Sequence, residues 1–191
     1  MIKIKHVGLL FMSMLYMAAC SQNKEKAIPV AEAEEDKPAF FPVTGYIKGQ
    51  IAQMNTNPIL YKTINGQTDS AWVQKETYNT VFAHFLSPEI DSMHMAHLFT
   101  ETKFADKTLG TFTFTYAPKN LLPKDFTLRR WDVYVDPKTN QVKNVFLEKQ
   151  IADTTIQLIW NNNASCKIMY LLKGTDGNPV LAKEEYIRWD F

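Results

Sequence analysis

The sequence predicts an α+β domain in which N-terminal helices pack on one face of an antiparallel, mostly meander β-sheet. In most of the first half of the 191-residue chain, apolar residues recur every three or four positions, as along one side of a helix. After residue 100 they alternate instead, and short turns separate consecutive strands, which favours antiparallel neighbours. Helices in one half and strands in the other are typical of the α+β class.

The first predicted helix runs from Thr44 to Met54. Thr44 is a residue type that suits an N-cap, and Asn55-Thr56-Asn57-Pro58 ends the helix because its residues favour turns and proline interrupts the hydrogen bonding. The apolar face is formed by Ile47, Ile51 and Met54, and the polar face by Lys48, Gln50 and Gln53. We therefore expect one face of this helix to lie against the sheet.

Two more helices are predicted, from about Lys75 to Leu86 and from Asp91 to Phe99. The earlier of the two carries the clearest helical stripe in the chain, formed by Tyr78, Val81, Phe82, Phe85 and Leu86. Ser87-Pro88 lies between the helices, with serine suited to a cap and proline to the first helical position. The later helix is expected to direct Met95, Leu98 and Phe99 inward.

The strand pattern begins with a hairpin. Asn65-Gly66 favours a tight turn because both residues tolerate positive φ, and it joins the predicted strands 59–64 and 68–73. Farther along, a meander of five or six consecutive strands is predicted, and its segments are 111–116, 130–135, 142–148, 155–160, 166–173 and 180–191. Asp136-Pro137-Lys138-Thr139-Asn140 provides one of the connecting turns.

Residues 1–20 have the pattern of an export signal. Lys3 and Lys5 form a basic start, and an apolar run follows that is shorter than the roughly 20 residues a membrane-spanning helix needs. The run ends in Met17-Ala18-Ala19-Cys20, which resembles the lipobox of bacterial lipoproteins. An uncut anchor helix is the alternative, and the shortness of the run and the position of the cysteine disfavour it.

The resemblance implies that residues 1–19 are a signal peptide and that Cys20 becomes the lipidated first residue of the mature protein. Several acyl chains anchor a protein firmly, whereas one chain binds a membrane only marginally. Ser21 rather than Asp follows the cysteine, which in this family favours the outer membrane, facing the periplasm. Residues 20–42 are rich in Lys, Glu, Ala and Pro and predict a flexible tether, and residues 43–191 predict a single domain.

The charge balance argues against nucleic acid as a partner. Removal of residues 1–19 takes away two lysines and no acids, so 19 basic residues (21 less two) face 20 acidic ones. A chain so close to neutral has no basic field that would attract nucleic acid.

One histidine cluster is a candidate metal site. On the predicted helix His94 and His97 lie one turn apart, and Asp91 and Glu101 continue that face. Two imidazoles and a carboxylate are ligands for Zn²⁺ or Cu²⁺, and a neighbouring methionine adds a soft ligand for Cu(I). The same residues also form the polar face of an amphipathic helix. Because an HxxH pair is far less specific than HExxH, we predict a solvated face and no metal, with His94, His97 and Glu101 as the candidates that remain.

Signals of catalysis are missing from the sequence. It contains no G-x-S-x-G or Ser-x-x-Lys nucleophile motif, and its seven glycines form neither a phosphate-binding loop nor a dinucleotide fingerprint. Cys166 lies in an alternating apolar strand and is predicted to be a small buried hydrophobe. The carboxylates of Asp132, Glu148, Glu184 and Glu185 are scattered over strands, where surface ladders of charged pairs are the default.

We therefore predict a non-enzymatic binding or assembly module of the cell envelope that needs no cofactor. The alternative is a carrier of a small apolar ligand, held in a cleft between the sheet and the helix 78–86. Asp136-Pro137-Lys138-Thr139 with its flanking aromatic residues is faintly similar to part of the PepSY family of small extracytoplasmic modules. That similarity covers about twenty residues and implies only the same extracytoplasmic setting.

Overall fold

The computed structural model describes residues 40–54, 58–108 and 110–189, and these residues form nine strands, four short α-helices and one 3₁₀ turn. The helical elements are α1 (Val43–Gln53), η1 (Lys75–Thr77), α2 (Tyr78–Val81), α3 (Ala83–Leu86) and α4 (Ser92–Met95). The strands are β1 (Ile59–Ile64), β2 (Gln67–Trp72), β3 (Phe99–Asp106), β4 (Thr111–Pro118), β5 (Leu128–Val135), β6 (Val142–Ile151), β7 (Thr154–Asn161), β8 (Ser165–Lys173) and β9 (Pro179–Trp189).

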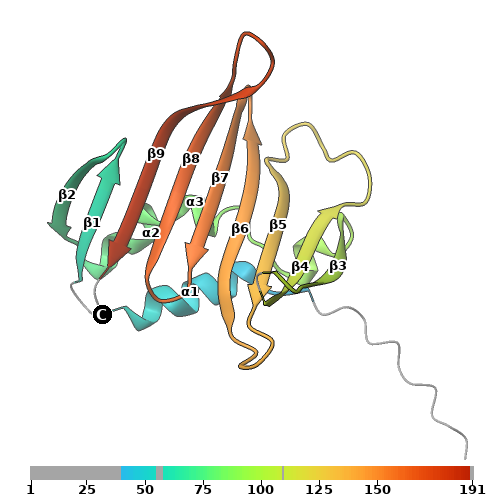
Figure 1. Cartoon of the computed structure of the whole chain (residues 1–191), viewed down its shortest axis with the longest axis horizontal. Coiled ribbons are helices and arrows are strands. Elements are labelled where there is room, and N and C mark those ends of the chain that lie inside the picture. The colour runs from blue at the N-terminus through green and yellow to red at the C-terminus, as the bar shows by residue number, and fades with distance from the viewer. Residues whose placement is uncertain (1–39, 55–57, 109, 190–191) are drawn as a thin grey trace, which may run out of the picture. The chain divides into compact units, whose positions relative to one another are not determined.

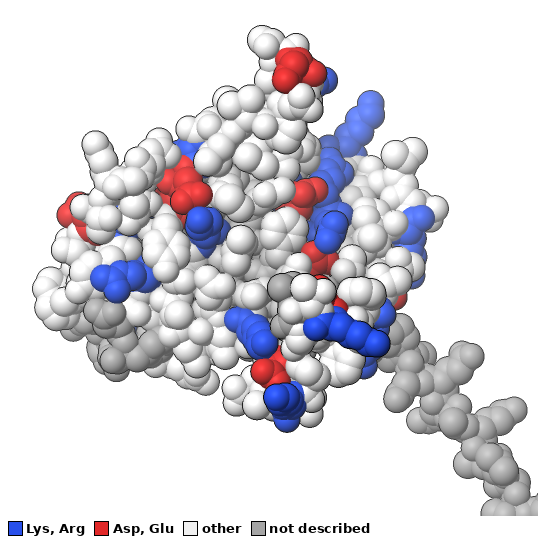
Figure 2. Space-filling model, in the orientation of Figure 1, with Lys and Arg blue, Asp and Glu red and all other residues white. Residues whose placement is uncertain are grey.

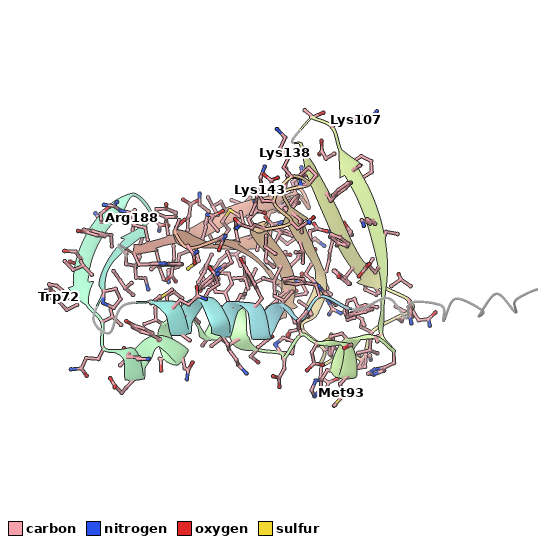
Figure 3. All side chains as sticks on the ribbon, turned by 90° about the horizontal axis from the view of Figure 1, so that it is seen from below. Trp72, Met93, Lys107, Lys138, Lys143 and Arg188 are labelled. Atoms are coloured by element: carbon pink, nitrogen blue, oxygen red, sulfur yellow. The ribbon has the colours of Figure 1, made fainter. Side chains whose placement is uncertain are left out.

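All nine strands belong to one antiparallel sheet in the order β2-β1-β9-β8-β7-β6-β5-β4-β3 (Figure 1). Strands β3 to β9 form a consecutive meander, so the predicted meander is confirmed. The hairpin β1–β2, which precedes the meander in the chain, extends the sheet beyond the last strand, where β1 pairs with β9. The sheet is open, with β2 and β3 as its edges, and the helices lie on one side of it (Figure 3).

Strand β3 is the element that the sequence did not reveal. Of its eight residues Phe99 alone is buried, and the side chain of Phe104 is 63% exposed. An edge strand with so little to bury lacks the alternation of apolar and polar residues on which strand prediction depends. Strands β6 and β7, by contrast, have buried residues at alternating positions.

The predicted hairpin turn is confirmed. Asn65 and Gly66 join β1 to β2 with φ values of 46° and 86°, the left-handed region that a type I′ turn requires at both central positions. The Asn65 side chain also accepts a hydrogen bond from the backbone N–H of Glu184 at 2.9 Å, which ties the turn to the neighbouring strand β9.

Helix α1 matches the prediction in extent, and its apolar face is buried as expected, with Ile47 fully inaccessible. Two details of the prediction are wrong. Pro42, not Thr44, is the N-cap, and Thr44 lies inside the helix, where its hydroxyl accepts a hydrogen bond from the N–H of Ile90 at 2.8 Å. Gln50 does not face water, because its side chain is buried and accepts a hydrogen bond from the N–H of Asn163.

The second predicted helix exists as three short pieces, η1, α2 and α3, with a break at Phe82. Its apolar stripe nevertheless packs inward as predicted, since Tyr78, Phe82 and Phe85 are buried. Phe82 meets Trp160 and Trp189 edge-on, with ring centroids 5.3 and 5.6 Å apart. The stripe therefore survives because packing against two tryptophans fixes it, although the backbone is not one continuous helix.

The third predicted helix is much shorter than expected. Only Ser92–Met95 is helical, Asp91 caps it, and Phe99 already belongs to β3. The Ser87–Pro88 peptide bond is cis, and the residues from Ser87 to Asp91 form no helix, so the predicted start at Ser87-Pro88 is wrong. Met95 and Phe99 are buried as predicted, and Leu98 is half-buried.

An aromatic cluster near β3 is buried in the core, and we call it the closed end. Trp131 stacks on Tyr116, with ring centroids 4.6 Å apart and planes within 8°. Phe99 approaches the same indole at 4.6 Å and Phe40 at 6.1 Å. Because Phe40 is buried here, the compact domain begins before residue 43, inside the segment predicted as tether.

Candidate functional site

A cleft of about 670 Å³ lies on the same face of the sheet as the closed end but toward the opposite edge, between the hairpin β1–β2 and the helices α2 and α3. Its size falls within the roughly 300–1,000 Å³ that is usual for small-molecule sites. Apolar side chains form most of its wall, and they are Leu60, Ile64, Val73, Val81, Ile168 and Ile187. Charged or ionisable side chains converge on it from four elements, and they are Lys62, Asp69, His84 and Glu185. We call this region the cleft end.

Glu185 is the polar centre of the cleft. Its side chain is 8% exposed, and each carboxylate oxygen receives one ammonium group, Lys62 Nζ at 2.6 Å and Lys183 Nζ at 2.6 Å. The hydroxyl of Tyr170 donates to the same carboxylate at 3.3 Å. Burial opposes ionisation of this group, but the hydrogen bonds from the two lysines outweigh it and lower the pKa of Glu185. The carboxylate is therefore fixed in its charged form.

His84 extends this network into the wall of the cleft. Its Nε2 lies 3.3 Å from the Tyr170 hydroxyl, and the two rings meet edge-on at 6.0 Å. Burial and then the positive charge of Lys149 lower the pKa of His84, and only Glu185 acts in the opposite direction. A Tyr170 hydroxyl that donates to Glu185 can accept a hydrogen bond from a proton on His84 Nε2, and the lowered pKa of His84 favours the neutral ring.

Lys149 supports the network from behind. This lysine is only 4% exposed, and its ammonium group donates to the backbone carbonyls of His84 and Ser87, where α3 ends. Burial lowers the pKa of Lys149 to about 8. A cation at the C-terminal end of a helix satisfies carbonyls that have no partner within the helix. Lys149 thus fixes the position of the backbone that carries His84.

The sequence contained a signal for Lys149 that the strand prediction did not use. Val145 and Leu147 are inward-facing, so the alternation along β6 places Lys149 on the same buried face. A lysine at an inward position is unusual. The predicted strand ended at residue 148, one residue short of this signal.

The structure separates the predicted metal candidates. His94 lies on α4 and its Nδ1 is 2.8 Å from Asp91 Oδ1, whereas Glu101 lies on β3 opposite Tyr116. Burial first, and then the hydrogen bond with Glu101, raise the pKa of Tyr116. Among the described residues, the side chains close enough to share an ion are Glu89, Asp91 and His94, with ligand atoms within 4.8 Å of one another. Neither His97 nor Glu101 belongs to that group.

The four scattered carboxylates differ more than predicted. Glu148 and Glu184 are half-buried and make ordinary polar contacts across the sheet with Gln157 and Lys167. Asp132 and Glu185, by contrast, are buried, so a surface ladder is the wrong description for them. Asp132 is held by the Arg130 guanidinium, with Nη2 2.7 Å from Oδ2. A buried carboxylate is costly without a partner, and each of these two has at least one cation within hydrogen-bonding distance.

Cys166 is a buried thiol in the core, as predicted. It is inaccessible to solvent, and burial raises its pKa far above the range in which a thiolate forms at neutral pH. The predicted lipidation site, Cys20, lies outside the described residues, as does the rest of the predicted signal peptide.

What the cleft can do chemically follows from these contacts. Its apolar wall can hold a hydrocarbon or aromatic group, and its charged groups can orient a polar end. Both oxygens of Glu185 are already occupied by lysines, and His84 is bound to Tyr170, so these groups hold each other in place. This arrangement favours binding over proton transfer.

No family model, curated protein or solved structure matches the chain. Within the described ranges, none of the helices is long and apolar enough to cross a membrane.

Proposed function

We propose that this protein is a non-enzymatic binding lipoprotein of the cell envelope, and that the cleft end holds a small, mainly apolar ligand. The observation that carries the proposal is a cleft of about 670 Å³ with an apolar wall and, in its floor, a carboxylate whose two oxygens are both paired with lysines. Groups that already satisfy one another provide a fixed polar surface and leave the chemistry of a bound molecule unchanged.

The anchor is the second part of the proposal. The resemblance of Met17-Ala18-Ala19-Cys20 to a lipobox supports lipidation of Cys20 and a location at the outer membrane, facing the periplasm. Basic and acidic side chains are interspersed on the face drawn in Figure 2, and this distribution supports a partner other than nucleic acid.

Native mass spectrometry tests ligand binding directly. Protein purified from the cells that make it is expected to carry a bound adduct. The variant Ala71→Trp places a large side chain on the wall of the cleft and should lose the adduct. Ala105→Trp is the matched control, because Ala105 is also exposed on an edge strand but lies at the opposite edge of the sheet. An adduct that Ala71→Trp retains would place the ligand elsewhere, and a wild-type protein without an adduct would contradict the carrier function.

The anchor is tested by Cys20→Ser. This variant should move from the detergent phase to the aqueous phase and should lose the mass of the acyl chains. A Cys20→Ser protein that still partitions with detergent at its full-length mass would contradict lipidation.

A further inference from the structure

The charges around the cleft do not cancel. Lys62, Lys149 and Lys183 surround the network, and they face two acids, Glu185 and Asp69. At His84 the imbalance is larger, because all three lysines disfavour a positive charge on the ring and Glu185 alone favours it. Asp69 lies on the exposed strand β2, where its carboxylate accepts the backbone N–H of Ser70 at 2.8 Å. The inner part of the cleft is therefore electropositive.

Lys62 is the cation that a ligand can reach. It lines the cleft and its side chain is 46% exposed. An ammonium group has three donors, and the contact with Glu185 uses one of them. Lys183 is similarly exposed, at 44%, but it does not line the cleft and lies over the ring of Tyr170, 5.3 Å from the centroid. Lys149 is buried behind the wall. Glu185 thus holds Lys62 at the cleft while the other two lysines offset its negative charge.

We propose that the ligand is an anionic amphiphile of the carboxylic acid class, with its head at Lys62 and its apolar part along Leu60, Val81, Ile168 and Ile187. This inference rests on the proposed function, since it names the ligand of the same cleft. The apolar part gains from leaving water, and the carboxylate gains a charge-assisted hydrogen bond in an electropositive setting. A cationic amphiphile of the same length would meet Lys62 as a like charge.

A series of ligands with one chain length and three head groups tests the charge preference. The full chain with Cys20→Ser keeps every described residue and avoids interference from its own acyl chains. Calorimetric titration is carried out with decanoate and decyltrimethylammonium below their micelle concentrations and with decanol below its solubility limit. We expect decanoate to bind about tenfold more tightly than the ammonium compound, with decanol between them.

A pair of lysine variants tests the position of the head group. Lys62→Gln should weaken decanoate binding about tenfold and leave decanol affinity unchanged within about twofold. Lys167→Gln is the matched control, because Lys167 also pairs with a glutamate of β9, Glu184 at 3.2 Å, but on the opposite face of the sheet. It should bind all three compounds as the unsubstituted protein does. Circular dichroism checks that both variants are folded.

The outcomes separate this inference from the proposed function. If all three compounds bind equally, the anionic ligand class is wrong while the apolar cleft stands. If decanoate is preferred but Lys62→Gln leaves its affinity unchanged, the position of the head group at Lys62 is wrong. If none of the three compounds binds to the folded protein, the proposed binding function fails as well.

Discussion

The closed end and the cleft end lie on the same face of one sheet, yet they are built differently. A single row of cross-strand partners joins them across all nine strands, in the order Gln67, Ile64, Glu185, Ile168, Leu158, Leu147, Trp131, Tyr116 and Glu101. At the closed end the row is filled by stacked rings with no exposed surface. At the cleft end Glu185 occupies a core position and the next residue, Ile64, is exposed.

This difference suggests that stability and the proposed binding depend on different ends of the sheet. Protein interiors are packed nearly as closely as organic crystals. A site that keeps free volume for a ligand therefore has fewer packing contacts than the rest of the core. The closed end supplies dense packing for the fold. The cleft end keeps its shape through ion pairs and hydrogen bonds instead, which hold side chains in place without filling the space between them. We expect substitutions at the two ends to differ accordingly.

The largest effect is expected for Trp131→Ala at the closed end. Removal of a fully buried indole leaves a cavity among Phe40, Phe99 and Tyr116 and should lower the free energy of unfolding by about 3–5 kcal/mol. Trp72→Ala is the matched control at the cleft end, since Trp72 on β2 is 70% exposed, and should change stability by less than about 0.5 kcal/mol. Urea denaturation measures both. Equal losses would show that the two ends share the stability of the fold.

The variant Lys149→Met tests how much the burial of the Lys149 ammonium group lowers the free energy of unfolding. Burial lowers the pKa of Lys149 to about 8 in the folded protein, below the ordinary lysine value of 10.5, so between these values the unfolded chain binds more protons. The stability of the wild type should therefore rise with pH relative to the variant, by about 2 kcal/mol from pH 8 to pH 10. Other titrating groups occur in both proteins and cancel in the difference. A difference in unfolding free energy that is constant over this range would contradict the assignment.

The structures of the two regions differ in how far the sequence predicts them, because different interactions define each region. The meander and the inward stripe of Tyr78, Phe82 and Phe85 follow from periodic apolar residues, which act locally along the chain. The pairing of β1 with β9 joins segments more than a hundred residues apart, and local patterns do not encode it. The cleft was foreseen only as an alternative between sheet and helix. Glu185 and Lys149 were missed because their partners come from other strands and from α3.

Glu185→Gln should have a smaller effect, because water can reach the lysines it leaves behind. Lys62 and Lys183 are both nearly half exposed, so we expect a loss of about 1 kcal/mol at neutral pH. The pKa of Glu185 is lowered, so its contribution is present above the usual carboxyl pKa and disappears as the pH falls through the folded value. The difference between wild type and variant in thermal denaturation should shrink in acid.

The matched control for this variant is Glu184→Gln on the opposite face of β9. Glu184 pairs with Lys167 at 3.2 Å and is 36% exposed, so its replacement should cost less than about 0.5 kcal/mol. If Glu184→Gln and Glu185→Gln lower the stability by the same amount, the ionic cluster does not maintain the shape of the cleft.

The smallest effects are expected near the closed end, at the residues first considered as metal ligands. His97 is exposed and Glu101 lies on another element, so His97→Ala should change stability by less than about 0.5 kcal/mol. The ligand atoms of Glu89, Asp91 and His94 lie closer to one another, but each of these three side chains already has a polar partner. Asp91 Oδ1 accepts both the backbone N–H and the imidazole of His94 at 2.8 Å, and Lys48 lies 3.4 Å from Glu89.

An ion would have to displace these contacts at a solvated surface, where its ligands gain nothing from burial. Calorimetric titration with Zn²⁺ should therefore show no tight binding, and His94→Ala should leave the titration unchanged. A tight one-to-one curve that His94→Ala abolishes would place a metal centre beside the closed end. The cleft end would then no longer be the part of the described domain best suited to binding.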